Sequence, residues 1–138
     1  MTPQAIPQAI IDTHAVIWYL NADPRLSAPA KTCIADAANQ GLPILVPSIC
    51  LIEIIYLSEK GRIPPDMLAR LEAALLLPDA VLRVTDLTQA VALAVGRVPR
   101  SEVPELPDRI IAGTGLHFNV PVISRDHKIR SSIVATIW

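Results

Sequence analysis

The sequence lacks any apolar run of the roughly 18 residues that a membrane-spanning helix needs. Its first residues, "MTPQAIPQAIID", lack the basic region that opens a secretory signal peptide. We therefore expect a cytoplasmic protein with no membrane contact. An excess of positive charge is also absent, since the formal net charge is −1. This balance argues against a protein that coats nucleic acid electrostatically, but it leaves room for a small site that acts through a metal ion.

Cysteine is scarce as well. Cys33 and Cys50 lie far apart with no CxxC spacing, so we expect two buried free thiols. Internal repeats, linkers and low-complexity tracts are absent, and 138 residues suffice for one domain with a substantial core. Apolar residues make up 51% and charged residues 18%, a globular composition. The mean hydropathy of +0.42 is high, which predicts that some apolar surface faces another chain.

Short apolar strands alternate with helical stretches along the chain. Strands are predicted over 8–11, 43–47, 80–84 and 121–124, with a fifth at the edge over 135–138. Helices are predicted over 15–20, 27–41, 48–61, 64–78, 86–98 and 108–118, the second capped by Ser27 and the third by Ser48. This alternation predicts an α/β class fold: a single three-layer α/β/α domain over 1–138 with a central, mainly parallel sheet of four to five strands.

Four acidic residues lie where such a fold brings distant segments together. Asp12 directly follows the first strand, and Asp126 follows the fourth by two residues. Asp108, after Pro107, belongs to the first turn of a helix. Glu53 is the single charge within "ICLIEIIYL", with no lysine or arginine three or four residues away. Because ligands of parallel sheets sit beyond the carboxyl ends of the strands, we expect all four carboxylates to converge there.

Each acid also has an ordinary structural interpretation, since Asp12 and Asp108 suit helix starts and Asp126 suits a turn. Convergence, however, is costly: two carboxylates about 4 Å apart repel by roughly 4 kcal/mol at an effective dielectric of 20. Protonation or a cation must relieve that repulsion, and an all-oxygen cluster suits Mg²⁺ or Mn²⁺. His14 and His127 flank acids, but surface or capping roles are the simpler expectation for both.

Four stretches of the sequence carry a resemblance to a known family. They are "IDTHAVIWYL", "PSICLIEIIYLSEKGRI", "LPDRIIAGTGLHFNVPVISRDHKI" and the terminal "TIW", which span nearly the whole chain in order. The second and third together are quite specific. The chain resembles the PIN-domain ribonucleases, and most closely the VapC-type toxins of bacterial toxin–antitoxin modules.

The resemblance implies a complete site. The family's acidic positions correspond to Asp12, Glu53, Asp108 and Asp126, and its small hydroxyl positions to Thr13 and Ser124. It further implies an endoribonuclease that hydrolyses RNA phosphodiester bonds with Mg²⁺ or Mn²⁺ and leaves a 5′-phosphate and a 3′-hydroxyl. The expected partners are an RNA substrate, a cognate antitoxin whose C-terminal segment enters the active-site groove, and a second copy in a homodimer. We expect the apolar helices over 15–20 and 64–77 to contribute to that dimer.

Other functions fit the sequence less well. A phosphoacceptor domain would need a lysine at the end of the fourth strand, where "VISRD" has none, and a dehalogenase-like phosphatase would need an acid where His14 stands. A dinucleotide site would need a glycine fingerprint just after a strand, whereas "GTG" at 113–115 lies mid-helix and predicts close packing. The remaining alternative is a non-catalytic PIN-fold module that binds RNA or protein without turnover.

Overall fold

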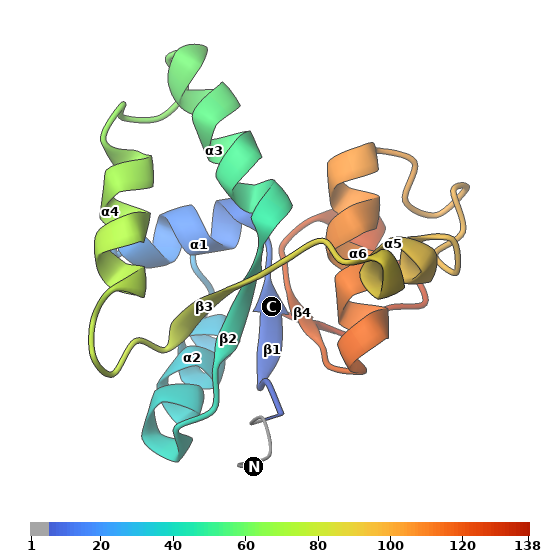
Figure 1. Ribbon diagram of the computed structural model, residues 1–138, viewed down its shortest axis with the longest axis horizontal. Coiled ribbons are helices and arrows are strands. Elements are labelled where there is room, and N and C mark those ends of the chain that lie inside the picture. Colours follow the sequence, from blue (N-terminus) through green and yellow to red (C-terminus); the bar gives the residue numbers. More distant parts are fainter. Residues whose placement is uncertain (1–5) are drawn as a thin grey trace.

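A five-stranded sheet forms the centre of the molecule (Figure 1), of which the computed structural model describes residues 6–138. All strand pairs are parallel, and the strand order is β3-β2-β1-β4-β5. The strands are β1 (Ala9–Ile11), β2 (Ile44–Pro47), β3 (Leu82–Thr85), β4 (Val122–Ile123) and β5 (Thr136–Ile137). The predicted parallel sheet is therefore confirmed, and it contains five strands.

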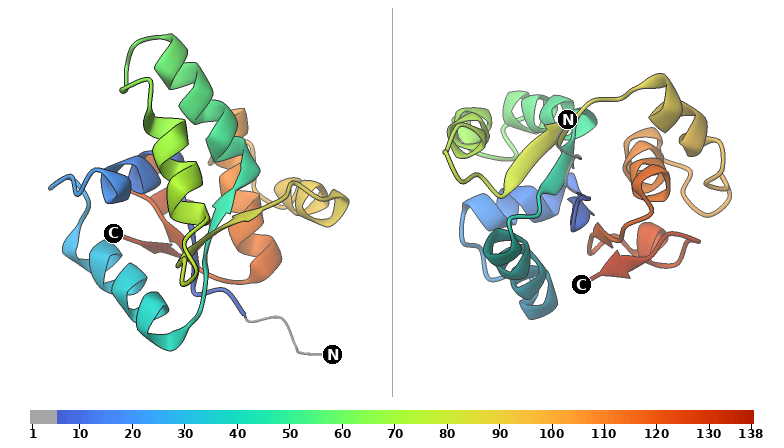
Figure 2. Two further views of the ribbon diagram at one scale, coloured as in Figure 1. Left: turned by 60° about the vertical axis from the view of Figure 1, so that its left-hand side comes forward. Right: turned by 60° about the horizontal axis from the view of Figure 1, so that its bottom comes forward.

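Seven helices surround this sheet in the described part of the chain. They are α1 (Thr13–Leu20), α2 (Ala28–Gln40), α3 (Ser48–Glu59), α4 (Met67–Leu75), α5 (Gln89–Val95), α6 (Leu106–Phe118) and α7 (His127–Arg130). In Figure 1, α5 and α6 lie on one side of the sheet, while α1, α2 and α4 lie on the other. Figure 2 shows the same separation from two further directions. The fold is a three-layer α/β/α arrangement, as predicted.

The core lies along β1 and β2, whose residues are all buried. A parallel strand covered by helices on both faces has no solvent side, which explains the unbroken apolar runs "AII" and "ILVP". Helix α1 packs into this core, so that Val16, Ile17 and Trp18 are buried within the chain itself. Of the apolar side chains of α1 that were predicted to face a second copy, only Tyr19 and Leu20 stay partly exposed.

Helix α3 carries the exposed apolar surface instead. It projects beyond the end of β2 with α4 beside it (Figures 1 and 2), and only its Cys50 and Ile54 are buried. Ile52, Ile55 and Tyr56 are exposed to solvent. Because nothing in residues 6–138 covers these side chains, α3 accounts for part of the exposed apolar surface that the composition predicts.

Helix boundaries follow the predicted signals with some differences. Ser27 caps α2 by accepting a hydrogen bond from the backbone N–H of Ala30, as expected. Ser48 does not cap α3, because Pro47 takes the capping position and Ser48 is already helical. Helix α6 begins at Leu106, two residues earlier than predicted, since Pro107 fits its first turn. The short helix α7 was not predicted.

The two glycines of "GTG" pack helix α6 tightly, as predicted. A Cβ atom on Gly113 would lie 2.8 Å from the Cα of Val95 on α5, and one on Gly115 would lie 2.7 Å from Cγ2 of Val122 on β4. Both distances are too short for a side chain. Glycine therefore fixes how closely α6 approaches its neighbours, and with it the position of Asp108 at the start of the same helix.

Two expectations concern membranes and secretion. Within residues 6–138 no helix has the length and apolar character that crossing a bilayer demands. The expectation that the N-terminus carries no signal peptide concerns residues 1–5 in part, and these lie outside the described residues.

Candidate active site

The site lies where the order of strand addition in the sheet reverses. Strands β2 and β3 extend the sheet on one side of β1, and β4 then pairs with the other side of β1. Ile11 pairs with Ile123, and the backbone N–H of Asp12 donates to the carbonyl of Ile123 at 3.1 Å. Asp12 and Ser124 therefore emerge side by side at the carboxyl edge. This switch point is where open parallel sheets bind ligands.

Asp12 is the most buried acid of the site, at 7% exposure. Its Oδ1 accepts a hydrogen bond from the backbone N–H of Ala15 at 2.9 Å, so the side chain also caps α1. Burial raises the pKa of Asp12, while the Ser124 hydroxyl, the Ala15 N–H and His14 act in the opposite direction. The capping role expected of Asp12 is thus confirmed, and the same carboxylate lines the cavity described below.

Glu53 reaches the same edge from the second turn of α3. Its Oε1 accepts a hydrogen bond from the Thr13 hydroxyl at 2.5 Å, and Thr13 is the residue directly after Asp12. Within residues 6–138 the ion pairs are Arg25–Asp23 and Arg70–Asp66, so neither involves Glu53. Glu53 is therefore held toward the other acids, and no basic side chain of the described residues forms an ion pair with it.

Asp108 lies in the first turn of α6 and faces the same cavity. Partial burial raises the pKa of Asp108 to about 7, and the carboxylates of Asp126, Glu53, Asp12 and Glu105 add to that shift. A carboxyl group in a cavity whose pKa is raised by burial and by neighbouring acids is a candidate for a functional site.

Asp126 and Ser124 form a small hydrogen-bonded unit after β4. The buried Ser124 hydroxyl accepts the backbone N–H of Asp126 at 3.0 Å. Asp126 in turn accepts the backbone N–H of Ile129 at 3.0 Å and caps α7. The turn is thus fixed at both ends, which explains why a two-residue offset from the strand still leaves Asp126 at the sheet edge.

One cavity of about 280 Å³ brings these residues together. It is lined by Asp12, Thr13, His14, Glu53, Glu105, Pro107, Asp108, Ile111 and Asp126. No lysine or arginine of the described chain is among them, so five carboxylates face a space that contains no basic side chain. Every predicted acid and Thr13 line this cavity, whereas the buried Ser124 is not among its lining residues.

The family model of the PIN domain matches residues 9–132. The chain belongs to the PIN domain family. No curated protein matches this PIN domain in sequence. Its fold is similar to a chain of VapBC2 from Rickettsia felis bound to a promoter DNA fragment, with 17% identity, a TM-score of 0.69 and coverage of 93% of this chain and 96% of that one. It is also similar to a chain of a toxin–antitoxin complex from Klebsiella pneumoniae, with 21% identity, a TM-score of 0.61 and coverage of 94% and 96%.

The acid cavity of this PIN domain offers mainly oxygen donors, from its five carboxylates and Thr13, with His14 as the one nitrogen ligand on its lining. Oxygen is the ligand chemistry that Mg²⁺ and Mn²⁺ prefer. Among residues 6–138 no three of the His, Cys, Asp or Glu side chains are already arranged to hold one ion. The donor set fits a divalent ion that keeps several waters, as Mg²⁺ usually does.

Two residues near the site were missed by the sequence analysis. Glu105 precedes α6 and lines the cavity, but the predicted helix began only at Asp108. Its signal was present in "PELPD", where an acid stands three residues before Asp108 at a helix start. Arg125 lies against Trp18 beside the acids, and no sequence spacing links those two residues.

Proposed function

We propose that this PIN domain is a metal-dependent endoribonuclease that hydrolyses RNA phosphodiester bonds. The observation that supports it best is the cavity at the sheet's switch point, where carboxylates from four distant segments meet without a basic side chain. A binding module would be weakened by such a cluster, because RNA is itself an anion. The cluster becomes useful once a cation is bound within it.

The roles follow from position. Asp12 and Asp108 would hold Mg²⁺ or Mn²⁺ directly or through water, and Glu53 and Asp126 would complete the shell or position a second ion. When bound, the metal supplies charge stabilisation at the scissile phosphate and an activated water. Thr13 fixes the carboxylate of Glu53 by its hydrogen bond, and Ser124 fixes the backbone of Asp126. Burial and the neighbouring carboxylates raise the pKa of Asp108 to about 7, so this residue would have to release its proton near neutral pH in order to hold the cation.

We further propose that the protein acts as the toxin of a VapBC-type toxin–antitoxin pair in the cytoplasm. Its fold is similar to chains from two toxin–antitoxin complexes. A cognate antitoxin would then place a segment at the acid cavity and block it. We also propose that the chain forms a homodimer.

Cleavage of RNA by the purified protein tests the activity. We expect cleavage with Mg²⁺ or Mn²⁺, none with EDTA, and 5′-phosphate products. Asp108→Asn should lower the rate by orders of magnitude and remain folded, because it removes a charge and keeps the shape. Asp79→Asn, which removes a remote acid, should cleave like the wild type. A wild type that binds RNA but does not cleave it with either metal would favour the non-catalytic module instead.

A further inference from the structure

A second cavity adjoins the acid cavity on the side of α1. Its volume is about 320 Å³, and it is lined by Asp12, His14, Trp18, Arg125 and Asp126. Asp12, His14 and Asp126 line both cavities. The two spaces therefore form neighbouring parts of one site. Both are lined by carboxylates, and only the second is also lined by an arginine.

The guanidinium of Arg125 rests on an aromatic ring. Its Cζ lies 4.6 Å from the centroid of the Trp18 ring, within the range of a cation–π interaction. Trp18 is itself 5% exposed and packs against the rings of Trp138, at 5.7 Å, and His14, at 5.9 Å. The ring is thus a fixed support, while the Arg125 residue is exposed.

Arg125 has no anionic partner among residues 6–138. The guanidinium hydrogen bonds formed there belong to Arg25, Arg70 and Arg109, and the two ion pairs to Arg25 and Arg70. A cation–π contact leaves the N–H donors at the guanidinium edge available. Arg125 therefore presents an unneutralised charge and unused donors to the second cavity.

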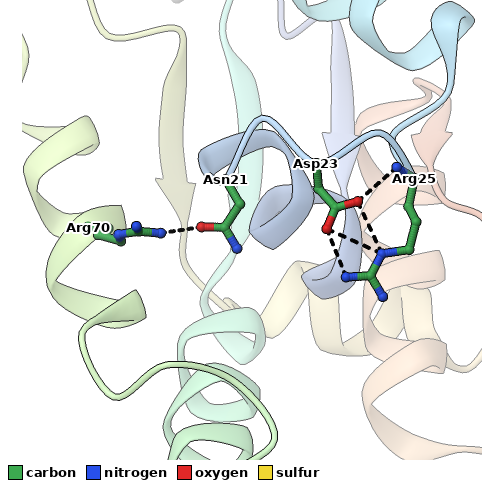
Figure 3. A network of polar contacts seen from close by, with 4 residues as sticks. All are labelled: Asn21, Asp23, Arg25 and Arg70. Atoms are coloured by element: carbon green, nitrogen blue, oxygen red, sulfur yellow. Dashed lines mark hydrogen bonds and ion pairs between the residues drawn. The ribbon is translucent and has the colours of Figure 1, made fainter.

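Arg25 provides an internal comparison, because it lies on the same ring. Its Cζ is 5.0 Å from the Trp18 centroid, but Asp23 holds its guanidinium with Nη2–Oδ2 at 2.8 Å (Figure 3). Arg25 does not line the second cavity. Of the two arginines on Trp18, one is neutralised within the chain and the other faces the site.

We propose that Arg125 binds a backbone phosphate of the RNA next to the scissile phosphate, with Trp18 as the residue that positions the guanidinium. This inference rests on the proposed ribonuclease activity. Arginine and phosphate form strong charge-assisted hydrogen bonds, frequently bidentate ones. A polyanion that approaches five carboxylates also needs a cation beside them, and a chain of net charge −1 has no general positive field to supply it. The position of Arg125 explains how one strand can span both cavities.

Steady-state cleavage of a single-stranded RNA at several salt concentrations tests the assignment. Arg125→Gln should raise KM by about 10-fold or more, the value of one charged hydrogen-bonding contact, and change kcat by less than about twofold. The slope of log(kcat/KM) against log[salt] should become shallower by about 0.7, the contribution of one phosphate on a single strand. Arg125→Lys should restore the slope, because it keeps the charge.

Arg25→Gln is the matched control, since it removes the other guanidinium from the same ring and should leave KM and the salt slope at wild-type values. An Arg125→Gln variant that cleaves RNA with unchanged KM and unchanged slope would overturn the phosphate site while leaving the ribonuclease proposal intact. A wild type that cleaves no RNA would overturn both. Equal effects of the Arg25 and Arg125 substitutions would show a loss of Trp18 packing rather than a phosphate contact, and would also overturn the assignment.

Discussion

The hydroxyl of Thr13 donates a hydrogen bond of 2.5 Å to Oε1 of Glu53, a residue 40 positions further along the chain. Thr13 is 3% exposed and begins α1, directly after Asp12, whereas Glu53 lies on α3. The bond therefore joins the helices that follow β1 and β2. It explains how a single charge within an apolar stretch is held at the site instead of turning toward solvent.

The first prediction separates a charge cluster from a structural role for Glu53. Glu53→Gln keeps the volume and removes one negative charge from a crowded cavity, so the metal-free variant should melt at or above the metal-free wild type. At 100 times its dissociation constant a metal adds roughly 2.7 kcal/mol to the stability of the wild type, and the variant should gain less. Thermal melts with EDTA and with excess Mg²⁺ measure both effects.

Thr13→Val supplies the control for that experiment. It removes the hydroxyl that binds Glu53 but leaves the carboxylate in the cavity, so its metal response should stay closer to that of the wild type. If Glu53 instead served a buried structural pair, Glu53→Gln would lower metal-free stability by about 3–5 kcal/mol. Such a loss, together with an unchanged response to Mg²⁺, would count against the cluster.

The second prediction concerns pH. Burial and neighbouring carboxylates raise the pKa of Asp108 to about 7, above the value of about 4 for an unfolded aspartate. Between these values the folded state keeps a proton that the unfolded state releases. The contribution of Asp108 to metal-free stability therefore falls as pH rises from about 4 to about 7 and stays low above that. Asp108→Asn should remove this slope and exceed the wild type in stability at about pH 8.

Denaturant unfolding in EDTA at several pH values measures that slope. Buried Asp12, whose pKa is also raised, should leave part of the pH dependence in the variant. Asp79→Asn, far from the cavity, should keep the wild-type slope. A variant at Asp108 that is less stable than the wild type above pH 7 would show that the carboxylate has a stabilising partner.

The third prediction tests the close approach of α6 to its neighbours. Gly113→Ala would place a Cβ 2.8 Å from the backbone Cα of Val95, and Gly115→Ala would place one 2.7 Å from the side chain of Val122. Each should lower the free energy of unfolding by about 1–3 kcal/mol, as overpacking does. Only the second clash can be relieved by truncation.

Double variants distinguish the two glycines. Val122→Ala should offset part of the cost of Gly115→Ala, which appears as a favourable coupling energy in a double-mutant cycle. Val95→Ala should offset less of the cost of Gly113→Ala, because the Val95 backbone remains in place. If Val95→Ala fully restored the stability lost in Gly113→Ala, helix α5 would be free to shift away from α6. The contact between these two helices would then not fix the position of Asp108.

Much of this fold could be predicted from the sequence, because the local helix and strand signals agree with the alternation of strands and helices that a parallel sheet requires. Strands buried on both faces appear as short apolar runs, and the carboxyl ends of β1 and β4 carry Asp12 and Asp126 without further information. Asp108 was placed correctly since proline marks a helix start. The residue pairs that no local signal connects were beyond reach: Thr13 with Glu53, and Arg125 with Trp18, meet only through tertiary packing.

Burial of whole helices was the weaker part of the prediction. The stretches "AVIWYL" and "ICLIEIIYL" are similarly apolar, yet α1 is packed inside and α3 exposes Ile52, Ile55 and Tyr56. Composition alone does not say which apolar helix the sheet will cover. The strand order decides it, because α1 follows the central strand β1 whereas α3 projects beyond β2.

The last prediction follows from that exposed face and concerns the proposed homodimer. Ile52 and Tyr56 are 51% and 60% exposed and lie four positions apart, so they share one side of α3. Leu76 and Leu77, at the end of neighbouring α4, are exposed as well.

If this surface joins two copies, light scattering at micromolar concentration should give twice the chain mass of 14.9 kDa. Ile52→Lys with Tyr56→Lys should give the monomer, because two charges would be buried without partners. The control is Leu93→Lys, which places a charge on an apolar residue of α5 that is 70% exposed. This variant should remain dimeric, because an added charge should disrupt the dimer only at the interface. A monomeric wild type would refute the dimer, and a double variant that stays dimeric would move the interface away from α3.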